Sequence, residues 1–197
     1  MYICRQNTTK CMLMTSFDEL MLRRRSVREY DAEKNVTREE IEQMIAAALE
    51  APTWKNSETG RYHVVMNDNT LMPQVAECLW ENNRKRVVGC GALIVTSFVR
   101  NRSGFHRADD GSSQPDNELG NGWGCYDLGL QNSYLLLKAA ELGIDTLIMG
   151  LREADDLRRV LQIPDEETIV AVIAVGHRKT EPQRPRRKEV SEVSRFY

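Results

Sequence analysis

The sequence predicts an α+β fold in which a mixed sheet is flanked by helices. Segments with the 3.6-residue period of amphipathic helices alternate along the chain with short apolar runs that are typical of strands. The 197 residues are 41% hydrophobic and 28% charged, and neither an internal repeat nor a change in composition divides them. We therefore expect residues 14–197 to form one domain. Residues 1–13 show no period, and we expect them to be a disordered leader.

Two capping boxes predict the first helices. Ser16 and Glu19 have the spacing of such a box, and so do Thr37 and Glu40; each pair precedes apolar residues at helical spacing. The first helix should end near the arginine run at residues 23–25.

The middle of the chain is predicted to contain two strands and one helix. Residues 62–66 and 92–98 have the composition of strands, and a helix should begin at Pro73 and run to about Arg86. Residues 101–122 are polar and glycine-rich without any period. A structureless stretch of this length is usually a mobile loop or a lid over a site.

The C-terminal half should begin with a long helix. It starts at Trp123 and ends at Gly143, a residue that suits the left-handed cap position. A strand over 146–149, a helix over 153–161 and an apolar strand over 168–175 should follow.

Composition argues against several classes of protein. A net charge of −2 provides no overall field that would attract nucleic acid or an anionic membrane. The five cysteines are odd in number and lack C-x-x-C spacing, and the three histidines are scattered, so neither a disulfide framework nor a metal site is expected. No apolar run approaches the ~20 residues of a membrane span. We expect a cytoplasmic protein with no nucleic-acid or membrane partner.

The first candidate for a functional site is a turn rich in arginine. Arg23, Arg24, Arg25 and Arg28 surround Ser26 there. Their mutual repulsion would be offset by a phosphate, which the planar guanidinium binds through charge-assisted hydrogen bonds. Taken alone, a solvated basic turn is the more frequent outcome for such a run.

The second candidate is the basic tail that follows Gly176. An extended, proline-stiffened strap could reach the same anion, and a disordered tail without partners is an equally good interpretation. Its cationic residues are Arg178, Lys179, Arg184, Arg186, Arg187 and Lys188.

The third candidate is the segment over residues 51–57, at a helix end and before a strand. Backbone amides together with Thr53, Asn56 and Ser57 could bind a polar ring edge or a sugar-like chain. By itself, an ordinary capping turn is the more frequent explanation.

The order of these three features resembles that of the nitroreductase family, over about residues 20–188. One family motif is matched by Arg24, Arg25, Ser26, Arg28 and Tyr30, and another by Pro52, Thr53, Asn56 and Ser57. Trp123 and Asp127 match the start of the family's long helix. Two departures, Glu58–Arg61 in place of Gln-Pro-Trp and Met149 in place of a Glu found in some relatives, leave the acceptor and the choice between NADH and NADPH open.

The resemblance implies an intertwined homodimer with FMN at its interface. Arg24 and Ser26 would hold the phosphate and ribityl end beside Arg25, and Arg28 would approach the pyrimidine edge of the flavin. The partner subunit would contribute Thr53, Trp54 and Asn56, and Pro52 would also belong to the cofactor site. Asn83 and Arg86 would bind the pyrimidine edge or be an exposed helix end, Met149 and Gly150 would lie near flavin N5, and Arg184 and Arg186 would form the phosphate strap.

The function that the resemblance implies is transfer of a hydride from NAD(P)H through flavin N5 to a nitroaromatic, quinone or similar acceptor, by a ping-pong mechanism. No catalytic side chain is expected, because the cofactor carries the chemistry. Alternatives are a flavin reductase, enone reductase or dehalogenase of the same fold, and a non-catalytic flavin-binding sensor or carrier. Nucleic-acid binding through the basic segments is disfavoured by the overall charge and by the lack of an aromatic platform.

Overall fold

The computed structural model describes residues 16–197, so the leader predicted over residues 1–13 lies outside the described part. The helices are α1 (Phe17–Arg23), α2 (Arg38–Leu49), the 3₁₀ helix η1 (Trp54–Asn56), α3 (Met72–Glu77), α4 (Glu81–Arg86), α5 (Gly122–Leu142), α6 (Ala154–Leu161) and α7 (Val190–Val193). The strands are β1 (Gly60–Met66), β2 (Ala92–Val99), β3 (Phe105–Arg107), β4 (Ser113–Pro115), β5 (Asp145–Met149) and β6 (Glu167–Gly176).

The central sheet has four strands in the order β1-β2-β6-β5, and all neighbouring strands are antiparallel. Within residues 16–197 the parallel pairing is an isolated bridge between Ser26 and Thr146, on the outer edge of β5. The predicted α+β fold is confirmed. The four strands are antiparallel to one another, and the only parallel pairing described within residues 16–197 is made by the segment that contains the arginine turn.

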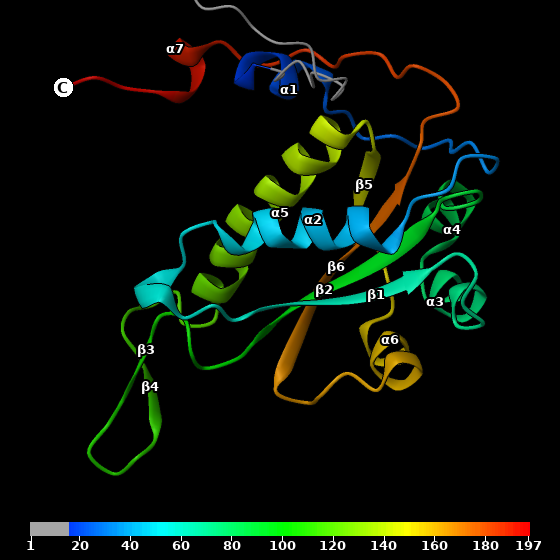
Figure 1. The fold of residues 1–197 in the computed structure, drawn as a ribbon. Helices are drawn as coiled ribbons and strands as arrows, with labels where there is room; N and C mark the ends of the chain where they lie inside the picture. Colours follow the sequence, from blue (N-terminus) through cyan, green and yellow to red (C-terminus); the bar gives the residue numbers. More distant parts are fainter. Residues whose placement is uncertain (1–15) are drawn as a thin grey trace, which may run out of the picture.

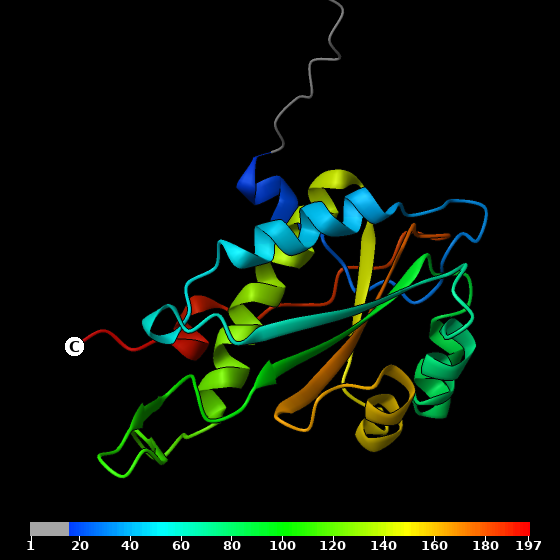
Figure 2. The same ribbon diagram turned by 60° about the horizontal axis from the view of Figure 1, so that its bottom comes forward.

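Helices cover both faces of this sheet, as Figures 1 and 2 show. Along β2, Ala92 and Ile94 point to one face and pack with residues of α2 and α5. The alternate residues Leu93 and Val95 point to the other face and join a core with residues of α3 and α6. Burial on both faces explains why β2 and β6 are apolar almost throughout.

Local signals in the sequence located the starts of α1 and α2 and the end of α5 correctly. Both predicted capping boxes are formed, with Ser16 bonded to Glu19 and Thr37 to Glu40. Gly143 terminates α5 in the left-handed conformation, at φ 81°.

The single helix predicted from Pro73 to Arg86 is wrong. The chain forms α3 and α4 instead, separated at residues 78–80, where Leu79 makes an antiparallel bridge with Arg152. Glu153 N donates to Cys78 O at 2.8 Å, so the backbone here bonds to a distant segment instead of continuing the helix. Tertiary contact has overridden the helical propensity.

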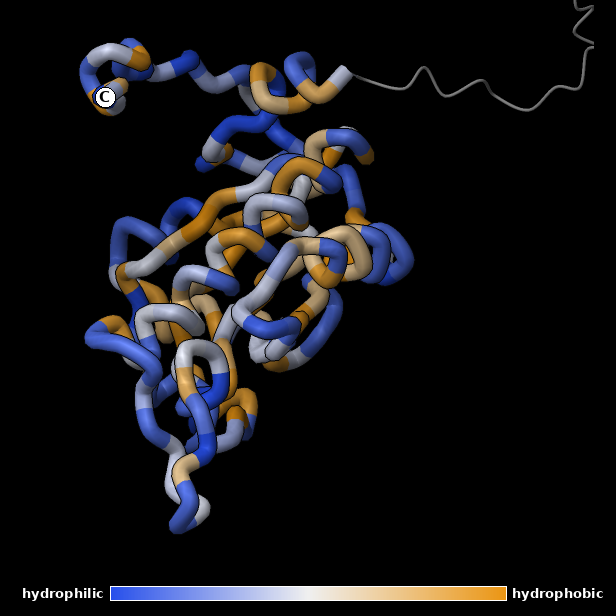
Figure 3. The backbone as a smooth tube through the Cα atoms, turned by 90° about the vertical axis from the view of Figure 1, so that its left-hand side faces the viewer, coloured by the Kyte–Doolittle hydropathy of each residue, from blue (hydrophilic) through white to orange (hydrophobic). Residues whose placement is uncertain are grey.

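The polar stretch 101–122 is not structureless as predicted. It contains the β3-β4 hairpin, which projects from the body of the molecule below η1 (Figures 1 and 2). Figure 3 shows that the hydrophobic segments gather in the sheet and its flanking helices, whereas this hairpin is mostly hydrophilic. None of the helices described within residues 16–197 is long and apolar enough to span a membrane.

Tyr62 on β1 carries a buried hydroxyl that has no hydrogen-bond partner within residues 16–197. Burial raises the pKa of this phenol from 10.0 to about 12. Since a buried polar group without a partner is destabilising, we expect Tyr62→Phe to raise the free energy of unfolding at pH 7 by up to about 1 kcal/mol.

The same variant should change the pH dependence of stability. A raised folded-state pKa gives stability that is present below pH 10 and is lost as pH rises towards 12, because the unfolded chain ionises first. Tyr62→Phe should remove that part of the loss, which urea unfolding at several pH values measures. Lower stability of the variant at pH 7 would contradict this explanation.

Candidate functional site

The arginine turn is held against the outer edge of β5. Val27 is 1% exposed, and its N–H donates to Thr146 O at 3.0 Å. Ser26, which forms the bridge to Thr146, remains exposed. Arg28 Nη1 donates to Ser26 O at 3.1 Å, so its guanidinium folds back beside the turn. One buried valine therefore anchors the turn and leaves the serine and the arginines around it at the surface.

Positive charge is concentrated in this turn, and a residue of the tail adds to it. The pKa of Arg24 is lowered by burial first, and then by the positive charges of Arg187 and Arg25. Within residues 16–197 none of these three arginines forms an ion pair with a carboxylate, and buried Arg25 Nε has no hydrogen-bond partner. Arginines from the two ends of the chain are thus close enough to influence each other, and none of them has a carboxylate partner in the described residues, as an anion site requires.

The tail residue whose charge acts on Arg24 is Arg187, which belongs to the cationic tail identified in the sequence, whereas the resemblance assigns the phosphate contact to Arg184 and Arg186. Arg184 and Arg186 are exposed, and neither makes a side-chain hydrogen bond or ion pair in the described part of the chain. Their contact with a phosphate stays a prediction.

A buried ion pair fixes the start of the tail. Asp145, the first residue of β5, accepts hydrogen bonds from Arg178 N and Nε, each at 2.9 Å. These hydrogen bonds are the main reason that the pKa of Arg178 is raised. Lys179 N also donates to Glu29 O at 3.0 Å, so the tail leaves the sheet beside the segment that follows the arginine turn. Sequence reasoning missed Asp145, whose signal was a carboxylate at the start of an apolar strand.

A second group of predicted residues lies at the other end of β5. Met149 is buried and Gly150 is exposed. Asn83 is 5% exposed and donates through Nδ2 to Leu151 O at 3.0 Å, and Arg86 Nη1 lies 3.4 Å from Asn83 Oδ1. The alternative of an exposed helix end therefore does not hold for Asn83. The arginine turn and this group are separated by the length of β5, about 13 Å for five residues.

The predicted polar segment around η1 is held by a buried carboxylate. Asp127 of α5 is 2% exposed and accepts from Trp54 N at 3.0 Å and from Ser103 Oγ at 2.6 Å. The indole of Trp54 also packs against that of Trp123, with ring centroids 4.4 Å apart. Within residues 16–197, Trp54 Nε1 and Ser57 Oγ are buried without hydrogen-bond partners.

The backbone after Trp54 is strained. Lys55, Asn56 and Glu58 all have positive φ angles, of 48°, 53° and 47°. Non-glycine residues in this region cost free energy and persist where the surroundings impose them, often at binding sites. Together with the unpartnered polar atoms of Trp54 and Ser57, this strain marks the segment as a candidate for ligand binding.

In one chain, the η1 segment does not meet the other two groups. It lies at the start of α5, whereas the arginine turn and β5 lie near its end (Figures 1 and 2). The 21 residues of α5 span about 30 Å. A two-fold dimer in which the α5 helices run in opposite directions would bring the start of one α5 beside the end of the other.

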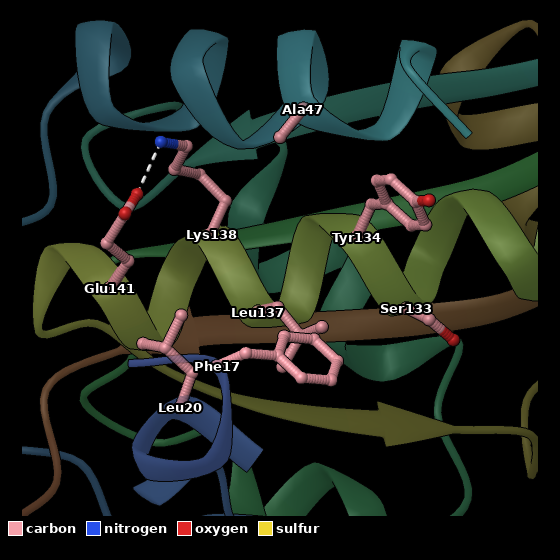
Figure 4. A pocket seen from close by; sticks show the side chains of 8 residues that line it. All are labelled: Phe17, Leu20, Ala47, Ser133, Tyr134, Leu137, Lys138 and Glu141. Carbon is pink, nitrogen blue, oxygen red and sulfur yellow. Dashed lines mark hydrogen bonds and ion pairs between the residues drawn. The ribbon is translucent and has the colours of Figure 1, made fainter. Parts of the chain in front are cut away.

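The outer face of α5 has the features of such a contact surface. Tyr126 and Tyr134 are 60% and 43% exposed, and a Cβ atom added at Gly129 would meet nothing within 4 Å. Beside this face lies a groove of about 490 Å³, shown in Figure 4. It is lined by Phe17, Leu20, Ala47, Ser133, Tyr134, Leu137, Lys138 and Glu141.

Comparison with known proteins gives concordant matches. The model of the Nitroreductase family matches residues 21–177. A putative NAD(P)H nitroreductase, MhqN, from Bacillus subtilis (strain 168) is 25% identical over 210 residues, covering 93% of this chain and 100% of the relative. A BluB-like flavoprotein from Clostridium difficile 630 superposes with a TM-score of 0.77 at 22% identity, covering 93% of this chain and 99% of that one. An oxidoreductase containing FMN superposes with a TM-score of 0.71 at 23% identity, covering 91% and 84%.

Proposed function

The chain belongs to the nitroreductase family, and on that premise we propose that it is an FMN-dependent oxidoreductase that uses NAD(P)H. The observation that carries this proposal is the cluster of Arg24, Arg25 and Arg187, which lacks a carboxylate partner within residues 16–197. The names of the relatives, an NAD(P)H nitroreductase and an oxidoreductase containing FMN, support the same cofactor and electron donor.

The residues present fit FMN in charge and in polarity. Arg24, Arg25 and Ser26 would bind the dianionic phosphate, which would offset the repulsion between the guanidiniums. Arg184 and Arg186 would approach the same phosphate from the tail, beside Arg187.

The other end of β5 suits the flavin ring. Asn83 and Arg86 would donate to the pyrimidine edge, where reduction places negative charge, and Arg28 would reach that edge by leaving its hydrogen bond to Ser26 O in the arginine turn. Met149 and Gly150 would lie near N5. Gly150 has no side chain, and a Cβ there would meet nothing within 4 Å, which leaves room for a ring to approach.

When bound, FMN supplies the redox chemistry, in which N5 accepts a hydride from NAD(P)H and a nitroaromatic, quinone or similar acceptor then receives electrons in a ping-pong cycle. The protein's contribution is to orient the reactants, to place donors at the developing charge and to exclude water. These tasks require no side chain to act as an acid or a base.

The functional unit in this proposal is a homodimer. Pro52, Thr53, Trp54 and Asn56 of one copy would complete the site formed by β5 and the arginine turn of the other. Support comes from the exposed tyrosines of α5 and from the strained backbone of the η1 segment. An interface along α5 would cover these tyrosines and bring the separated halves of the site together.

A substitution that introduces a charge on the outer face of α5 tests whether this face forms the dimer interface. We expect Gly129→Glu to convert the dimer to a monomer and to abolish FMN binding, because half of each site would be lost. The space around Gly129 admits a side chain, so the chain itself should stay folded. Light scattering after size-exclusion chromatography and the visible spectrum measure the two effects.

The matched control is Gln43→Glu, which adds the same charge at an exposed position of α2. It should remain dimeric and yellow. A Gly129→Glu variant that remains dimeric with FMN bound would place the interface elsewhere.

The experiment that tests the proposed function is to purify the protein, record its visible spectrum, and release and identify any bound flavin. Anaerobic NADPH or NADH should bleach the flavin absorbance, and a nitroaromatic or a quinone should restore it. Parallel assays with free flavin, an enone and a halogenated aromatic would separate the other reductases of this fold. A protein that stays colourless after reconstitution with FMN would refute the proposal, and bound flavin that NAD(P)H does not reduce would indicate a sensor or carrier.

A further inference from the structure

The β3-β4 hairpin carries a polar pocket that the flavin site does not use. It has a volume of about 410 Å³. Its lining residues are Asn101, Arg102, Phe105, His106, Arg107 and Ser113. All of them belong to the hairpin and its first connection, so the pocket lies on the part of the chain that projects from the body (Figure 1).

Two arginine side chains line the pocket without a direct polar partner among the described residues. Within residues 16–197, the side chains of Arg102 and Arg107 form no ion pair and no hydrogen bond. The nearest carboxylate contact is that of Asp116, whose Oδ1 lies 2.8 Å from His106 Nδ1 and whose Oδ2 lies 3.4 Å from Lys55 Nζ. This carboxylate is therefore already shared between His106 and Lys55, and both guanidiniums are available to an anion.

The hairpin turn carries two carboxylates, Asp109 and Asp110, and that of Asp110 is engaged in the turn itself. Asp110 Oδ1 accepts from Ser112 N at 2.8 Å, and this contact and that with the serine hydroxyl lower the pKa of Asp110. The pocket also includes the half-buried ring of Phe105. Two free guanidiniums near an aromatic ring suit a phosphate that is attached to a ring system.

The hairpin is tied to the η1 segment. The ion pair between Lys55 and Asp116 connects them directly, and Ser103 at the base of the hairpin bonds to the same Asp127 that holds Trp54. In the proposed dimer the η1 segment of one copy completes the flavin site of the other. The hairpin of that copy therefore lies beside the same site.

We propose that this hairpin pocket binds a phosphate group in the adenosine half of the pyridine nucleotide that reduces the flavin. The inference rests on the proposed function. The nicotinamide ring must reach flavin N5 at the dimer interface, so the phosphates of the same molecule lie outside the flavin pocket. The two arginines of the projecting hairpin would bind them there, by charge-assisted hydrogen bonds that contribute to KM and leave the hydride step unchanged.

The test uses FMN-loaded protein and the double variant Arg102→Gln with Arg107→Gln. We expect the KM for NADPH to rise about tenfold or more with kcat unchanged, because both phosphate contacts are lost. Binding of adenosine 2′,5′-bisphosphate, measured by calorimetry, should weaken by a similar factor. Benzyl-dihydronicotinamide, a hydride donor without phosphates, should reduce both proteins at the same rate.

The NADH measurements identify which phosphate is bound. An unchanged KM for NADH would assign the pocket to the 2′-phosphate of NADPH, and a parallel increase would assign it to the pyrophosphate. The control variant Arg38→Gln with Arg159→Gln removes two exposed arginines from α2 and α6 and should leave both KM values unchanged.

Two results would overturn the inference, and they differ. A KM for NADPH that stays within about twofold of the unsubstituted protein would show that the pocket does not bind the nucleotide, although the proposed function stands. Failure of both NADPH and NADH to reduce the flavin of the unsubstituted protein would remove the proposed function, and this inference with it.

Discussion

We expect Arg24→Ala to weaken FMN binding about 10- to 100-fold while leaving the stability of the cofactor-free protein unchanged or slightly higher. A charge-assisted hydrogen bond to the phosphate contributes roughly 1.5–3 kcal/mol, which corresponds to that change in Kd. Without the anion, Arg24 is partly buried and faces the like charges of Arg187 and Arg25, so its removal relieves repulsion. Flavin fluorescence titration measures the affinity, and urea unfolding measures the stability.

A loss of FMN affinity without a loss of stability distinguishes this role from a structural one. An arginine that stabilised the fold would lower both quantities when removed. Arg159→Ala, which removes an exposed arginine from α6, should change neither by more than a few tenths of a kcal/mol. Unchanged FMN affinity in Arg24→Ala would refute the assignment of the phosphate to this turn.

The tail can be tested in the same way. Arg24→Ala combined with Arg186→Ala should weaken FMN binding more than Arg24→Ala alone if Arg186 reaches the phosphate. A parallel double variant with Arg187→Ala tests the residue that lies beside Arg24 in the structure. Whichever tail substitution has the larger effect identifies the arginine of the strap.

We expect Asp127→Ala to lower the free energy of unfolding by on the order of 3 kcal/mol and to abolish FMN binding. The carboxylate is almost fully buried and accepts hydrogen bonds from Trp54 N and Ser103 Oγ. Its loss leaves two donors without a partner, and each hydrogen bond to a charged group contributes roughly 1.5–3 kcal/mol. Urea unfolding gives the stability, and a red shift of tryptophan emission would report release of Trp54.

Two further variants separate the contributions of Asp127. Asp127→Asn keeps an acceptor oxygen, so it should cost less stability than the alanine. Ser103→Ala removes one of the two hydrogen bonds and leaves the η1 segment held by the other, so it should retain FMN. If Asp127→Ala kept full FMN affinity, the η1 segment would not be part of the site.

Much of the local structure could be read from short sequence patterns. The capping boxes at Ser16 and Thr37, and Gly143 at the end of α5, act through hydrogen bonds or backbone conformations within a few residues. Such interactions do not depend on the rest of the fold. The break between α3 and α4 could not be read in this way, because it arises from the bridge between Leu79 and Arg152, which are far apart in sequence.

The candidate site shows the same division. The motif around Arg24 and Ser26 and the tail were recognised from residue types and order, because arginine chemistry and the family resemblance are properties of the sequence. The buried carboxylates Asp127 and Asp145 were not assigned their roles, since their partners Trp54 and Arg178 lie more than thirty residues away. A buried charge is recognisable only once its surroundings are known.

The amino-acid sequence by itself determined the order of the main helices and of the four strands of the central sheet, and the chemistry of the arginine-rich segments, because these depend on near neighbours and on side-chain type. The tertiary structure alone decided that Arg187 lies beside Arg24, that the η1 segment is a helix length away from β5, and that residues 101–122 form a hairpin with its own cationic pocket. These facts depend on long-range packing against the sheet, in which the free energy of burying side chains from distant segments outweighs local preference.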